Sequence, residues 1–211
     1  MDTAHVKFTI VNIGILTMNK FWGETQRMRS PTATCTLLQA GGKRLLVDPS
    51  PGPELLAPLL FDRTGLRPGA IDLVFLTHFH GDHRFGLELF AGKPWLMAAA
   101  GRAEWRERSP QEAGLIDRFL PAEGRLPQGI TLFPSPGHTL GSHSLLADTE
   151  WGKLAVTGDA VMTGDFFAAE EGYHNSVDFE QAASTIRRIK EVATLVIPGH
   201  DNLILNFGFP F

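Results

Sequence analysis

The sequence predicts an α/β fold in which helices cover the faces of β-sheet and a functional site lies where several strands end. Apolar strand-like segments alternate with segments of helical periodicity along the 211-residue chain. Four strand-like segments, 71–76, 130–133, 154–157 and 194–197, each lead through a short turn to a histidine or an aspartate. Because strand ends in such folds bring distant loops together on a rigid scaffold, we expect these residues to share one site.

Length and composition describe one globular unit. A chain of 211 residues with 43% hydrophobic and 20% charged residues has ample apolar material for a core. We therefore expect a single domain over residues 1–211. The lone cysteine, Cys35, excludes a disulfide within the chain, and its strand-like surroundings predict a buried, unreactive thiol.

The charge pattern argues against nucleic-acid and membrane partners. The formal net charge is −4 and basic residues occur in runs of no more than two, such as Arg187-Arg188, so no surface that follows a phosphate backbone is expected. No apolar run reaches membrane-spanning length, and residues 1–8 lack the apolar stretch of a signal peptide. We expect a cytoplasmic protein that acts on a small-molecule substrate.

Three strands and a helix are expected in the first third of the chain. The first strand spans 6–15, and segments 33–39 and 44–48 form a hairpin around Gly41-Gly42. A proline-rich turn after Asp48 then starts a helix. Its leucines recur at helical spacing and are predicted to be core: Leu55, Leu56, Leu59 and Leu60.

Helical patterns fill much of the rest. Segments 102–108 and 111–120 are predicted to be short surface helices, anchored to the sheet by Trp105 and Phe119. The clearest helix spans 178–192, where Asp178 and Gln181 fit a capping box. Its predicted apolar face consists of Phe179, Ala182, Ala183, Ile186 and Ile189.

Two irregular segments are candidates for the walls of a substrate pocket. Segment 17–24 carries three large apolar residues, which either pack back onto the core or form a lip over a site: Met18, Phe21 and Trp22. Segment 160–177 has weak periodicity, which is typical of a lid or a pocket wall, and carries Phe166, Phe167, Tyr173 and His174. A lip facing these aromatic residues predicts a partly apolar pocket for an ester, lactone or thioester, with Tyr173 and His174 as candidate substrate contacts.

Metal-binding residues are concentrated in the segment 77–83, Thr-His-Phe-His-Gly-Asp-His. It holds three of the eight histidines of the chain and one carboxylate. His78 and His80, two residues apart, point the same way only from an extended segment, and Gly81 permits a sharp turn that directs Asp82 and His83 elsewhere. The pattern predicts two adjacent metal ions, in preference to a zinc site on one helix or a histidine-rich surface loop.

Together with His138, Asp159 and His200, this motif resembles the metallo-β-lactamase superfamily, most closely its glyoxalase II and lactonase branches, over essentially the whole chain. The resemblance implies a four-layered αβ/βα sandwich of two mixed sheets flanked by helices, with metal ions at the shared edge. It also implies a ligand set: His78, His80 and His138 on one ion, Asp82, His83 and His200 on the other, and Asp159 as the bridge.

The resemblance leaves several activities open. Members that hydrolyse β-lactams lack an aspartate at the position of Asp159, and the chain has no room for the extra domain of the RNA-cleaving branch. A mononuclear iron sulfur dioxygenase, which uses two histidines and an aspartate, remains a competitor. A phosphodiesterase or nuclease is disfavoured by the acidic charge balance. A non-catalytic metal-binding module would have lost at least one ligand position, and none is lost.

The predicted ligands suit a catalytic site. Imidazole and carboxylate donors bind zinc, iron or manganese, and the absence of thiolate ligands argues against a closed structural zinc site. We expect two divalent ions, preferably Zn²⁺, about 3.5–4 Å apart, with a bridging hydroxide that attacks the small ester, thioester or lactone. Asp82 and Asp159 are the candidate catalytic residues, because either carboxylate can handle the transferred proton.

Polar residues beside the predicted ligands are candidates for orienting the imidazoles. They are Thr77, Ser135, Thr139, Asp48 and His143. For Asp48 the alternative is turn formation before Pro49, and for His143 it is an ordinary hydrogen-bonded histidine.

The C-terminal segment 203–211 is strongly apolar. It is expected either to pack on its own sheet or to lie in a homodimer interface, and the sequence does not choose between them.

Overall fold

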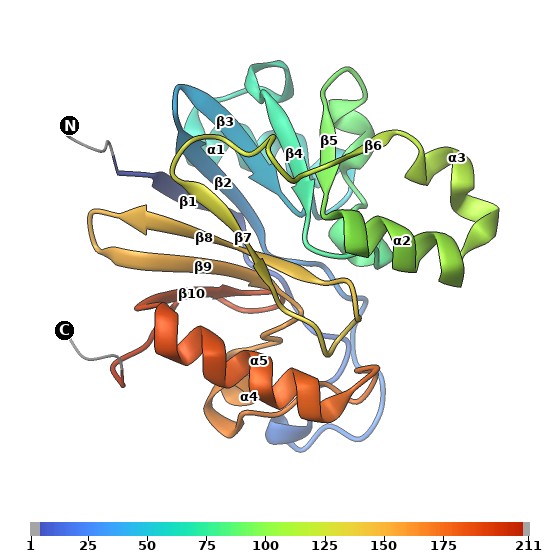
Figure 1. Cartoon of the computed structure of the whole chain (residues 1–211), viewed down its shortest axis with the longest axis vertical. Coiled ribbons are helices and arrows are strands. Elements are labelled where there is room, and N and C mark those ends of the chain that lie inside the picture. Colours follow the sequence, from blue (N-terminus) through green and yellow to red (C-terminus); the bar gives the residue numbers. More distant parts are fainter. Residues whose placement is uncertain (1–4, 209–211) are drawn as a thin grey trace.

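The computed structural model describes residues 5–208, which build two β-sheets with helices on their outer faces (Figure 1). The first sheet contains β1 (Lys7–Asn12), β2 (Cys35–Ala40), β3 (Lys43–Val47), β4 (Leu73–Leu76), β5 (Trp95–Met97) and β6 (Phe119–Pro121). The second contains β7 (Ile130–Pro134), β8 (His143–Thr149), β9 (Gly152–Gly158), β10 (Leu195–Pro198) and β11 (Ile204–Leu205). The helices are α1 (Pro53–Thr64), α2 (Ala99–Arg108), α3 (Ala113–Ile116), α4 (Gly164–Ala169) and α5 (Phe179–Val192).

Both sheets are mixed. The first runs in the order β1-β2-β3-β4-β5-β6, with β1 to β3 antiparallel and β3 to β6 parallel. The second runs in the order β11-β10-β9-β8-β7, and only β9 and β10 are parallel. The carboxyl ends of parallel neighbours lie at the same sheet edge, so β3 and β4 in one sheet, and β9 and β10 in the other, each present adjacent loops.

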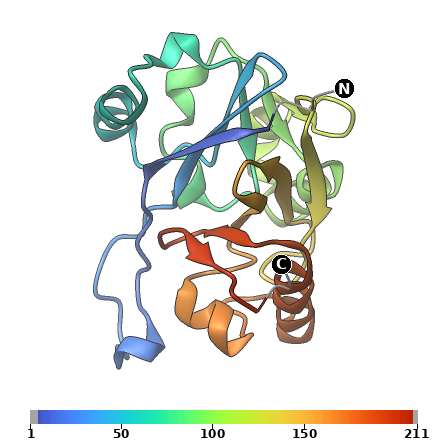
Figure 2. The same ribbon diagram turned by 90° about the vertical axis from the view of Figure 1, so that its left-hand side faces the viewer.

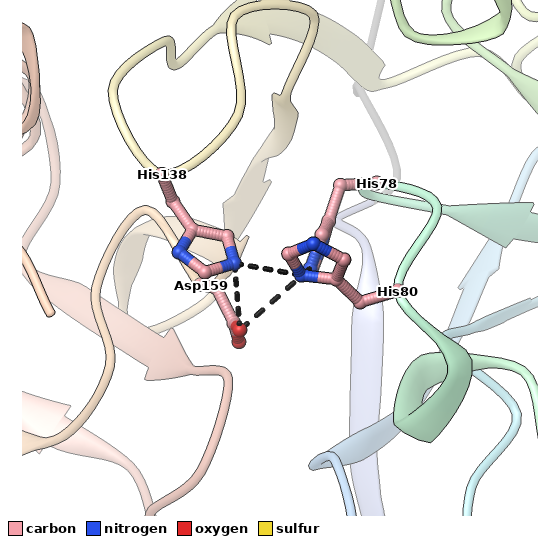
Figure 3. A group of neighbouring side chains, drawn as sticks. All are labelled: His78, His80, His138 and Asp159. Atoms are coloured by element: carbon pink, nitrogen blue, oxygen red, sulfur yellow. Dashed lines mark hydrogen bonds and ion pairs between the residues drawn. The ribbon is translucent and has the colours of Figure 1, made fainter. Parts of the chain in front are cut away.

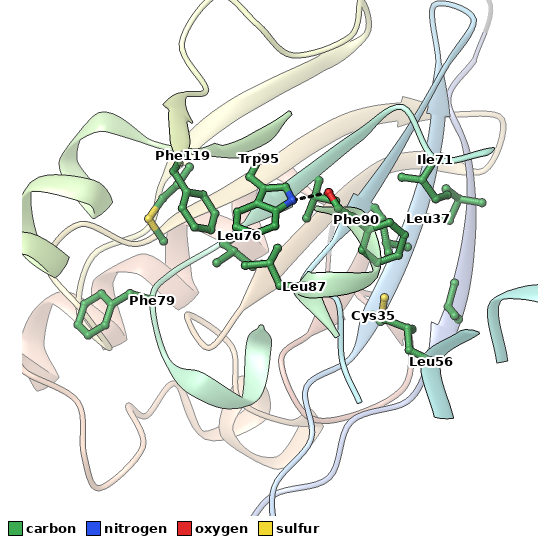
Figure 4. Packing of buried hydrophobic residues seen from close by; sticks show 14 of the residues in the cluster. Cys35, Leu37, Leu56, Ile71, Leu76, Phe79, Leu87, Phe90, Trp95 and Phe119 are labelled. Atoms are coloured by element: carbon green, nitrogen blue, oxygen red, sulfur yellow. Dashed lines mark hydrogen bonds between the residues drawn. The ribbon is translucent and has the colours of Figure 1, made fainter. Parts of the chain in front are cut away.

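The first sheet contributes side chains to two hydrophobic clusters, one on each of its faces. Successive side chains point to opposite faces of a sheet. Leu38 and Phe75 face the second sheet, where they pack in one cluster with Leu145. Leu37 and other outward residues of the first sheet pack in one cluster with Leu56 of α1 and Trp105 of α2. Figure 4 shows part of this cluster, including Leu37 and Leu56.

The outer face of the second sheet is covered by α5 and α4. Ile186 and Ile189 of α5 pack against Ala155 and Val196 from β9 and β10. The four-layered αβ/βα sandwich implied by the family resemblance is therefore confirmed. Among the described residues, no helix has the length and apolar character needed to cross a membrane.

The predicted hairpin of the first sheet is confirmed, but the first strand is shorter than expected. It ends at Asn12, and beyond it Ile15 makes only an isolated bridge to Thr32. The chain runs close to its neighbour here, since a Cβ on Gly14 would lie 2.5 Å from the backbone nitrogen of Thr34. We call residues 13–32 the N-terminal strap; it leaves the sheet as the blue loop at the lower left of Figure 2, beside α4.

Several predicted core positions are corrected by the structure. Leu56 and Leu60 are fully buried, whereas Leu55 is 62% exposed because only one side of α1 meets the sheet. Phe179 is 54% exposed, although Ala182, Ile186 and Ile189 of the same helix are buried as predicted. The first turn of α5 thus projects Phe179 away from the core.

The predicted helix at 111–120 is largely wrong. Only a short 3-10 turn at Pro110–Glu112 and α3 are helical, and the segment ends in β6. The edge strand forms because Phe119 packs beside Trp95 of β5, with ring centroids 5.4 Å apart. Trp105 and Phe119 are both buried, as expected for anchors of this region.

Two further predictions are confirmed. Asp178 caps α5, accepting hydrogen bonds from the Gln181 backbone N–H at 2.9 Å and from its side-chain amide at 2.7 Å. Cys35 is fully buried, and this burial raises the pKa of its thiol, as expected for an unreactive cysteine.

Candidate metal centre

The seven predicted ligands meet at the edge shared by the two sheets. The loop after β4 carries His78 and His80 and continues into a 3-10 turn, Gly81–His83. Three loops of the second sheet supply the others: His138 follows β7, Asp159 follows β9 and His200 follows β10. Two sheets therefore face each other across the site, each supplying about half of the side chains.

The first group consists of His78, His80, His138 and one oxygen of Asp159 (Figure 3). The Nδ1 atom of His80 lies 3.0 Å from Nε2 of His78 and 2.9 Å from Nε2 of His138. Oδ2 of Asp159 lies 3.2 Å from Nε2 of His138 and 3.6 Å from Nε2 of His78. Four potential ligand atoms thus converge on one point.

The second group consists of Asp82, His83 and His200. Its imidazoles face the other oxygen of Asp159: Oδ1 lies 3.0 Å from Nε2 of His83 and 3.2 Å from Nε2 of His200. Oδ2 of Asp82 lies 3.5 Å from the same nitrogen of His200. Asp159 therefore stands between the groups and presents a different oxygen to each.

The approach of β10 to Asp159 depends on glycine. A Cβ on Gly199 would lie 2.1 Å from Oδ1 of Asp159, and one on Gly158 would lie 2.2 Å from Oγ1 of Thr77. Gly158 also has a φ of +51°, which favours glycine. Gly199 thus lets the loops after β9 and β10 of the second sheet pack together, and Gly158 lets the second sheet approach Thr77 of the first.

Unpartnered buried atoms show that the donors fit metal ions. Nε2 of His83 and Oδ1 of Asp159 are buried and have no hydrogen-bond partner among the described residues, although they face each other. Their 3.0 Å contact is an ion pair without hydrogen-bond geometry, and buried polar atoms nearly always have hydrogen-bond partners, so a bound metal ion would satisfy both atoms. Imidazole and carboxylate donors around one point are the ligands that zinc, iron and manganese prefer.

Burial keeps the imidazoles of the first group neutral. Removal from water, together with the nearby charge of His83, lowers the pKa of His78 well below its usual value. Burial likewise lowers the pKa of His80 and lowers that of His138 to about 3. Metal ligands must be deprotonated, so these three side chains are already in the required form.

In the second group, nearby carboxylates raise the histidine pKa values instead of leaving them lowered by burial. Burial alone would lower the pKa of His83, but the charges of Asp159 and Asp48 outweigh it and raise that pKa well above the usual value. Asp159 similarly outweighs burial at His200 and raises its pKa. In turn, the histidine charges, led by that of His83, outweigh burial and hold the pKa of Asp159 well below its usual range.

Asp48 orients His83 and does more than end a strand. It follows β3, is 1% exposed, and accepts a hydrogen bond from Nδ1 of His83 at 2.9 Å. Its carboxylate also accepts from the Thr77 backbone N–H and hydroxyl, at 2.9 and 2.8 Å. Asp48 adopts a φ of +50°, which is uncommon outside glycine and is found at functional sites. Its contacts leave Nε2 of His83 directed at Asp159.

The other ligands are oriented by weaker or less direct contacts. His200 donates from Nδ1 to two carbonyls of the N-terminal strap, those of Ile15 (3.2 Å) and Thr32 (3.0 Å). Nδ1 of His78 lies 3.1 Å from Oγ1 of Thr77, as expected for an orienting residue. For His138, Nδ1 has no partner among the described residues.

The remaining candidates for orienting ligands stabilise the loop that carries His138. Thr139 bonds to Ser142 at 2.6 Å, and Ser135 accepts from Ser144 at 2.9 Å. Nδ1 of His143 lies 3.0 Å from the carbonyl of Gly141, and within residues 5–208 it makes no hydrogen bond to a predicted ligand. The alternative of an ordinary hydrogen-bonded histidine is therefore the one observed for His143.

One residue of this region was not anticipated. Glu104 of α2 is 8% exposed and accepts the backbone N–H groups of Leu140 (3.1 Å) and Gly141 (2.6 Å), just after His138. Arg108 donates to the same carboxylate at 2.9 Å. No sequence signal marks Glu104, because its partners are backbone groups of a distant loop.

A small pocket gives access to the two groups. It has a volume of about 270 Å³ and includes His80, Asp82, Asp159 and His200 in its lining. Its lining also includes the strap residues Leu16, Thr17 and Arg27, together with Tyr173 and Asn175. The site is therefore reachable from solvent, as an enzyme centre requires.

The predicted apolar lip and the aromatic residues facing it are found only in part. Met18, Phe166 and Tyr173 line a separate cavity of about 500 Å³. Phe21 and Trp22 do not line it: Phe21 packs against Phe166, with ring centroids 5.0 Å apart, and Trp22 is 54% exposed.

A sandwich of two mixed sheets with histidine and aspartate donors at its strand ends defines the class of this protein. The sequence profile described as the metallo-beta-lactamase superfamily matches residues 31–200. The chain belongs to this superfamily, as its motif predicted.

Curated relatives include a lactonase and a thioesterase. The chain is 31% identical over 159 residues to an N-acyl homoserine lactonase of Bacillus sp, across 67% of this chain and 60% of the lactonase. It is 25% identical over 186 residues to an atrochrysone carboxyl ACP thioesterase of Aspergillus fumigatus, across 87% of this chain and 55% of the thioesterase. The chain thus spans about 60% of the length of the lactonases it matches.

Solved structures share the fold. A Thermotoga maritima protein superposes with a TM-score of 0.69 at 20% identity, covering 95% of this chain and 99% of its own. The AiiA mutant of B. thuringiensis with N-decanoyl-L-homoserine bound at the active site has a TM-score of 0.62 at 21% identity, covering 90% and 88%.

Proposed function

We propose that this protein is a metal-dependent hydrolase with two metal ions that cleaves a small ester, thioester or lactone. One observation carries the proposal: the two oxygens of Asp159 face two separate ligand groups, at 3.2 Å from His138 on one side and 3.0 Å from His83 on the other. A bridging carboxylate is the arrangement expected where two ions act on one substrate.

Each ligand group would hold one of the two ions. His78, His80 and His138 would hold the first ion, and Asp82, His83 and His200 the second. When bound, divalent ions supply the Lewis acidity that activates water and polarises a carbonyl group. We assign Zn²⁺ as the preferred metal, with iron or manganese compatible with the same donors.

The protein residues position the reaction and handle its proton. Asp82 is partly exposed and lines the access pocket. We assign to its carboxylate the acceptance of a proton from the attacking water. Asp159 is buried, and the low pKa of its carboxyl keeps it charged, as a bridge between the groups requires. Contact with Asp48 keeps His83 in one tautomer.

The proposed substrate class follows from the relatives and from the pocket. The relatives are named as a lactonase and a thioesterase, both of which cleave an acyl group from oxygen or sulfur. The access pocket of about 270 Å³ suits the reacting portion of a small molecule and not a polynucleotide.

Metal analysis combined with hydrolysis assays tests this function. We expect the purified protein to contain two divalent ions per chain and to hydrolyse p-nitrophenyl acetate or a simple lactone. A chelator should abolish hydrolysis, and Zn²⁺ or Mn²⁺ should restore it. A single bound iron together with oxygen uptake on a persulfide would instead establish a sulfur dioxygenase. Cleavage of bis-p-nitrophenyl phosphate far faster than of any ester would establish a phosphodiesterase.

A further inference from the structure

Four side chains join the loop that carries His78 and His80 to α2 and to the 3-10 turn Pro110–Glu112. They are Phe79, Arg84, Trp105 and Glu112. None of the four belongs to the two ligand groups. Any role that they have in metal binding must therefore act through the loop.

Arg84 turns back toward the residue between the two histidines. It directly follows His83 in the chain, yet its Nε donates to the carbonyl of Phe79 at 3.1 Å. Its side chain is only 21% exposed. A hydrogen bond from a charged guanidinium is stronger than one between neutral groups. The bond therefore restrains the backbone at the centre of the His78–His80 pair.

Glu112 fixes the guanidinium from the other side. Its Oε1 accepts from Nη2 of Arg84 at 2.8 Å, and its Oε2 accepts from Nε1 of Trp105 at 2.7 Å. Burial would raise the pKa of Glu112, but these hydrogen bonds and the charge of Arg84 outweigh it and lower that pKa. The carboxylate thus stays charged, and it ties Arg84 to a residue of α2.

Trp105 is the rigid surface on which the cluster is built. It is fully buried in α2 and packs against Phe119 of β6, with ring centroids 5.5 Å apart. The guanidinium of Arg84 lies 4.8 Å from the centre of the Trp105 ring. The ring of Phe79 stacks on Trp105 at 6.2 Å, with 19° between the planes. Phe79 is thus held at its carbonyl by Arg84 and at its ring by Trp105.

The position of Phe79 affects the ligands on either side of it. Nε2 of His78 and Nδ1 of His80 lie 3.0 Å apart, and the rings of Phe79 and His80 meet edge-on at 5.0 Å. Within residues 5–208, the hydrogen bonds of His80 go only to other ligands, whereas metal-bound histidines usually have a further partner that orients them. The orientation of His80 therefore depends on its backbone and on the packing of Phe79.

Helix α2 supports both loops of the first group through consecutive residues. Glu104 accepts two backbone N–H groups of the loop that carries His138. Trp105, the next residue, holds the loop that carries His80. The ligands of the second group are instead oriented by Asp48 and by the N-terminal strap.

We propose that Arg84 is a positioning residue for the first metal ion, which acts through Phe79 and is itself held by Glu112 and Trp105. The inference rests on the two-ion site of the proposed function and adds a residue to it. Because Arg84 follows His83, its place in the chain predicts an effect on the second ion. Its contacts predict an effect on the first.

Arg84→Ala and a matched arginine variant test the proposal. Arg84→Ala removes both bonds of the guanidinium, whereas Arg106→Ala removes an exposed arginine of α2 that pairs with Asp117 at 2.6 Å. Zn²⁺ is titrated into the metal-free proteins in competition with a chromophoric chelator. We expect Arg84→Ala to weaken binding of the first ion roughly five- to tenfold and of the second by less than about twofold. Arg106→Ala should leave both affinities unchanged.

Two further measurements separate an effect on geometry from a loss of stability. His138→Ala and His200→Ala each lack a ligand of one group, so they assign the two binding steps to the two ions. With Co²⁺ in place of Zn²⁺, the visible absorption of the first site should change in Arg84→Ala, because its imidazoles are arranged differently. Arg84→Lys keeps a charged donor without the planar fork and should recover part of the affinity and of the spectrum.

Glu112→Gln keeps the proposal testable if Arg84→Ala does not fold. It retains an oxygen for the Trp105 N–H but loses the charge that pairs with Arg84, so it should weaken the first ion in the same direction and by less. Equal weakening of both ions, weakening of the second alone, or no change in either variant at unchanged Tm would overturn the positioning role.

The proposed function fails on different results. A wild type that binds a single ion or hydrolyses no ester contradicts that function. The positioning role of Arg84 would still stand if Arg84→Ala selectively weakened the ion bound by His80 and Arg84→Lys recovered part of the loss.

Discussion

The two ligand groups use similar residues but are supported differently. The imidazoles of the first group, His78, His80 and His138, lie against one another, and burial lowers their pKa values. Those of the second group, His83 and His200, lie against carboxylates that raise their pKa values. At the edge shared by the two sheets, the histidines of the first group are thus neutral, whereas those of the second group are paired with carboxylates.

The contacts behind the ligands differ in the same way. In the second group a buried carboxylate, Asp48, bonds directly to the His83 ring. In the first group, His138 depends on the backbone of its loop, which Glu104 holds through Leu140 and Gly141. We therefore expect the loss of the Asp48–His83 contact to weaken binding of the second ion more than the loss of the Glu104 contacts weakens binding of the first. Variants that affect one group only can test this difference.

The largest effect is expected at Asp159, which belongs to both groups. Asp159→Ala removes the oxygens that face His138 and His83, so both ions should be lost and hydrolysis should fall by about 100-fold or more. Elemental analysis and ester hydrolysis provide the measurement. Asp148→Ala, at an exposed surface carboxylate, serves as the control. Retention of two ions in Asp159→Ala would contradict the bridging role.

A smaller and one-sided effect is expected at Asp48. Asp48→Ala leaves the His83 ring without its acceptor, so the affinity for the second ion should fall roughly 10- to 100-fold while that for the first is kept. Titration with metal in competition with a chromophoric chelator resolves the two affinities. Equal weakening of both ions would show that Asp48 supports the whole strand-end cluster through Thr77 and not His83 in particular.

The opposite asymmetry is expected at Glu104. Glu104→Ala removes the acceptor for two backbone N–H groups beside His138, so the affinity for the first ion should fall by less than about tenfold and that for the second should not change. The same competition titration applies. Glu104→Gln keeps an oxygen acceptor and should recover part of the loss. If the second ion were the one weakened, indirect support through the loop would be disproved.

The smallest effect is expected at Arg108. Its guanidinium donates to Glu104, but its side chain is 43% exposed, and exposed ion pairs contribute about 1 kcal/mol or less. Arg108→Ala should change the affinity for the first ion by no more than a few-fold. A loss as large as that of Glu104→Ala would mean that the orientation of the carboxylate depends on Arg108.

The N-terminal strap, which lines the access pocket, is held in place differently from the two ligand groups. The ligands follow strands whose register is set by the sheets, whereas the strap is held to α4 by side chains such as Asn19 and Trp22 on Asp165. Rigid strand ends suit metal chemistry, and loops on such a scaffold suit variation in substrate recognition.

The sequence allowed the cluster of candidate ligands and the fold class to be predicted because their signals are local. An apolar strand followed by a turn and a histidine is visible in a few residues, as at His78 and His200. Exposure was predicted less well: Leu55 and Leu56 are equally apolar, yet only Leu56 faces the sheet. Phe179 likewise fits an apolar helical face but borders a cavity. Which side of a helix meets a neighbour depends on how the helix is docked.

By itself, the sequence determined which histidine and aspartate side chains are candidate metal ligands and that strands lead to them, because donor chemistry and strand periodicity are properties of short segments. Only the tertiary structure decided that each oxygen of Asp159 faces its own group, that Asp48 orients His83, and that Glu112 binds Arg84. These features join segments far apart in the chain, and their geometry arises only when the two sheets pack against each other.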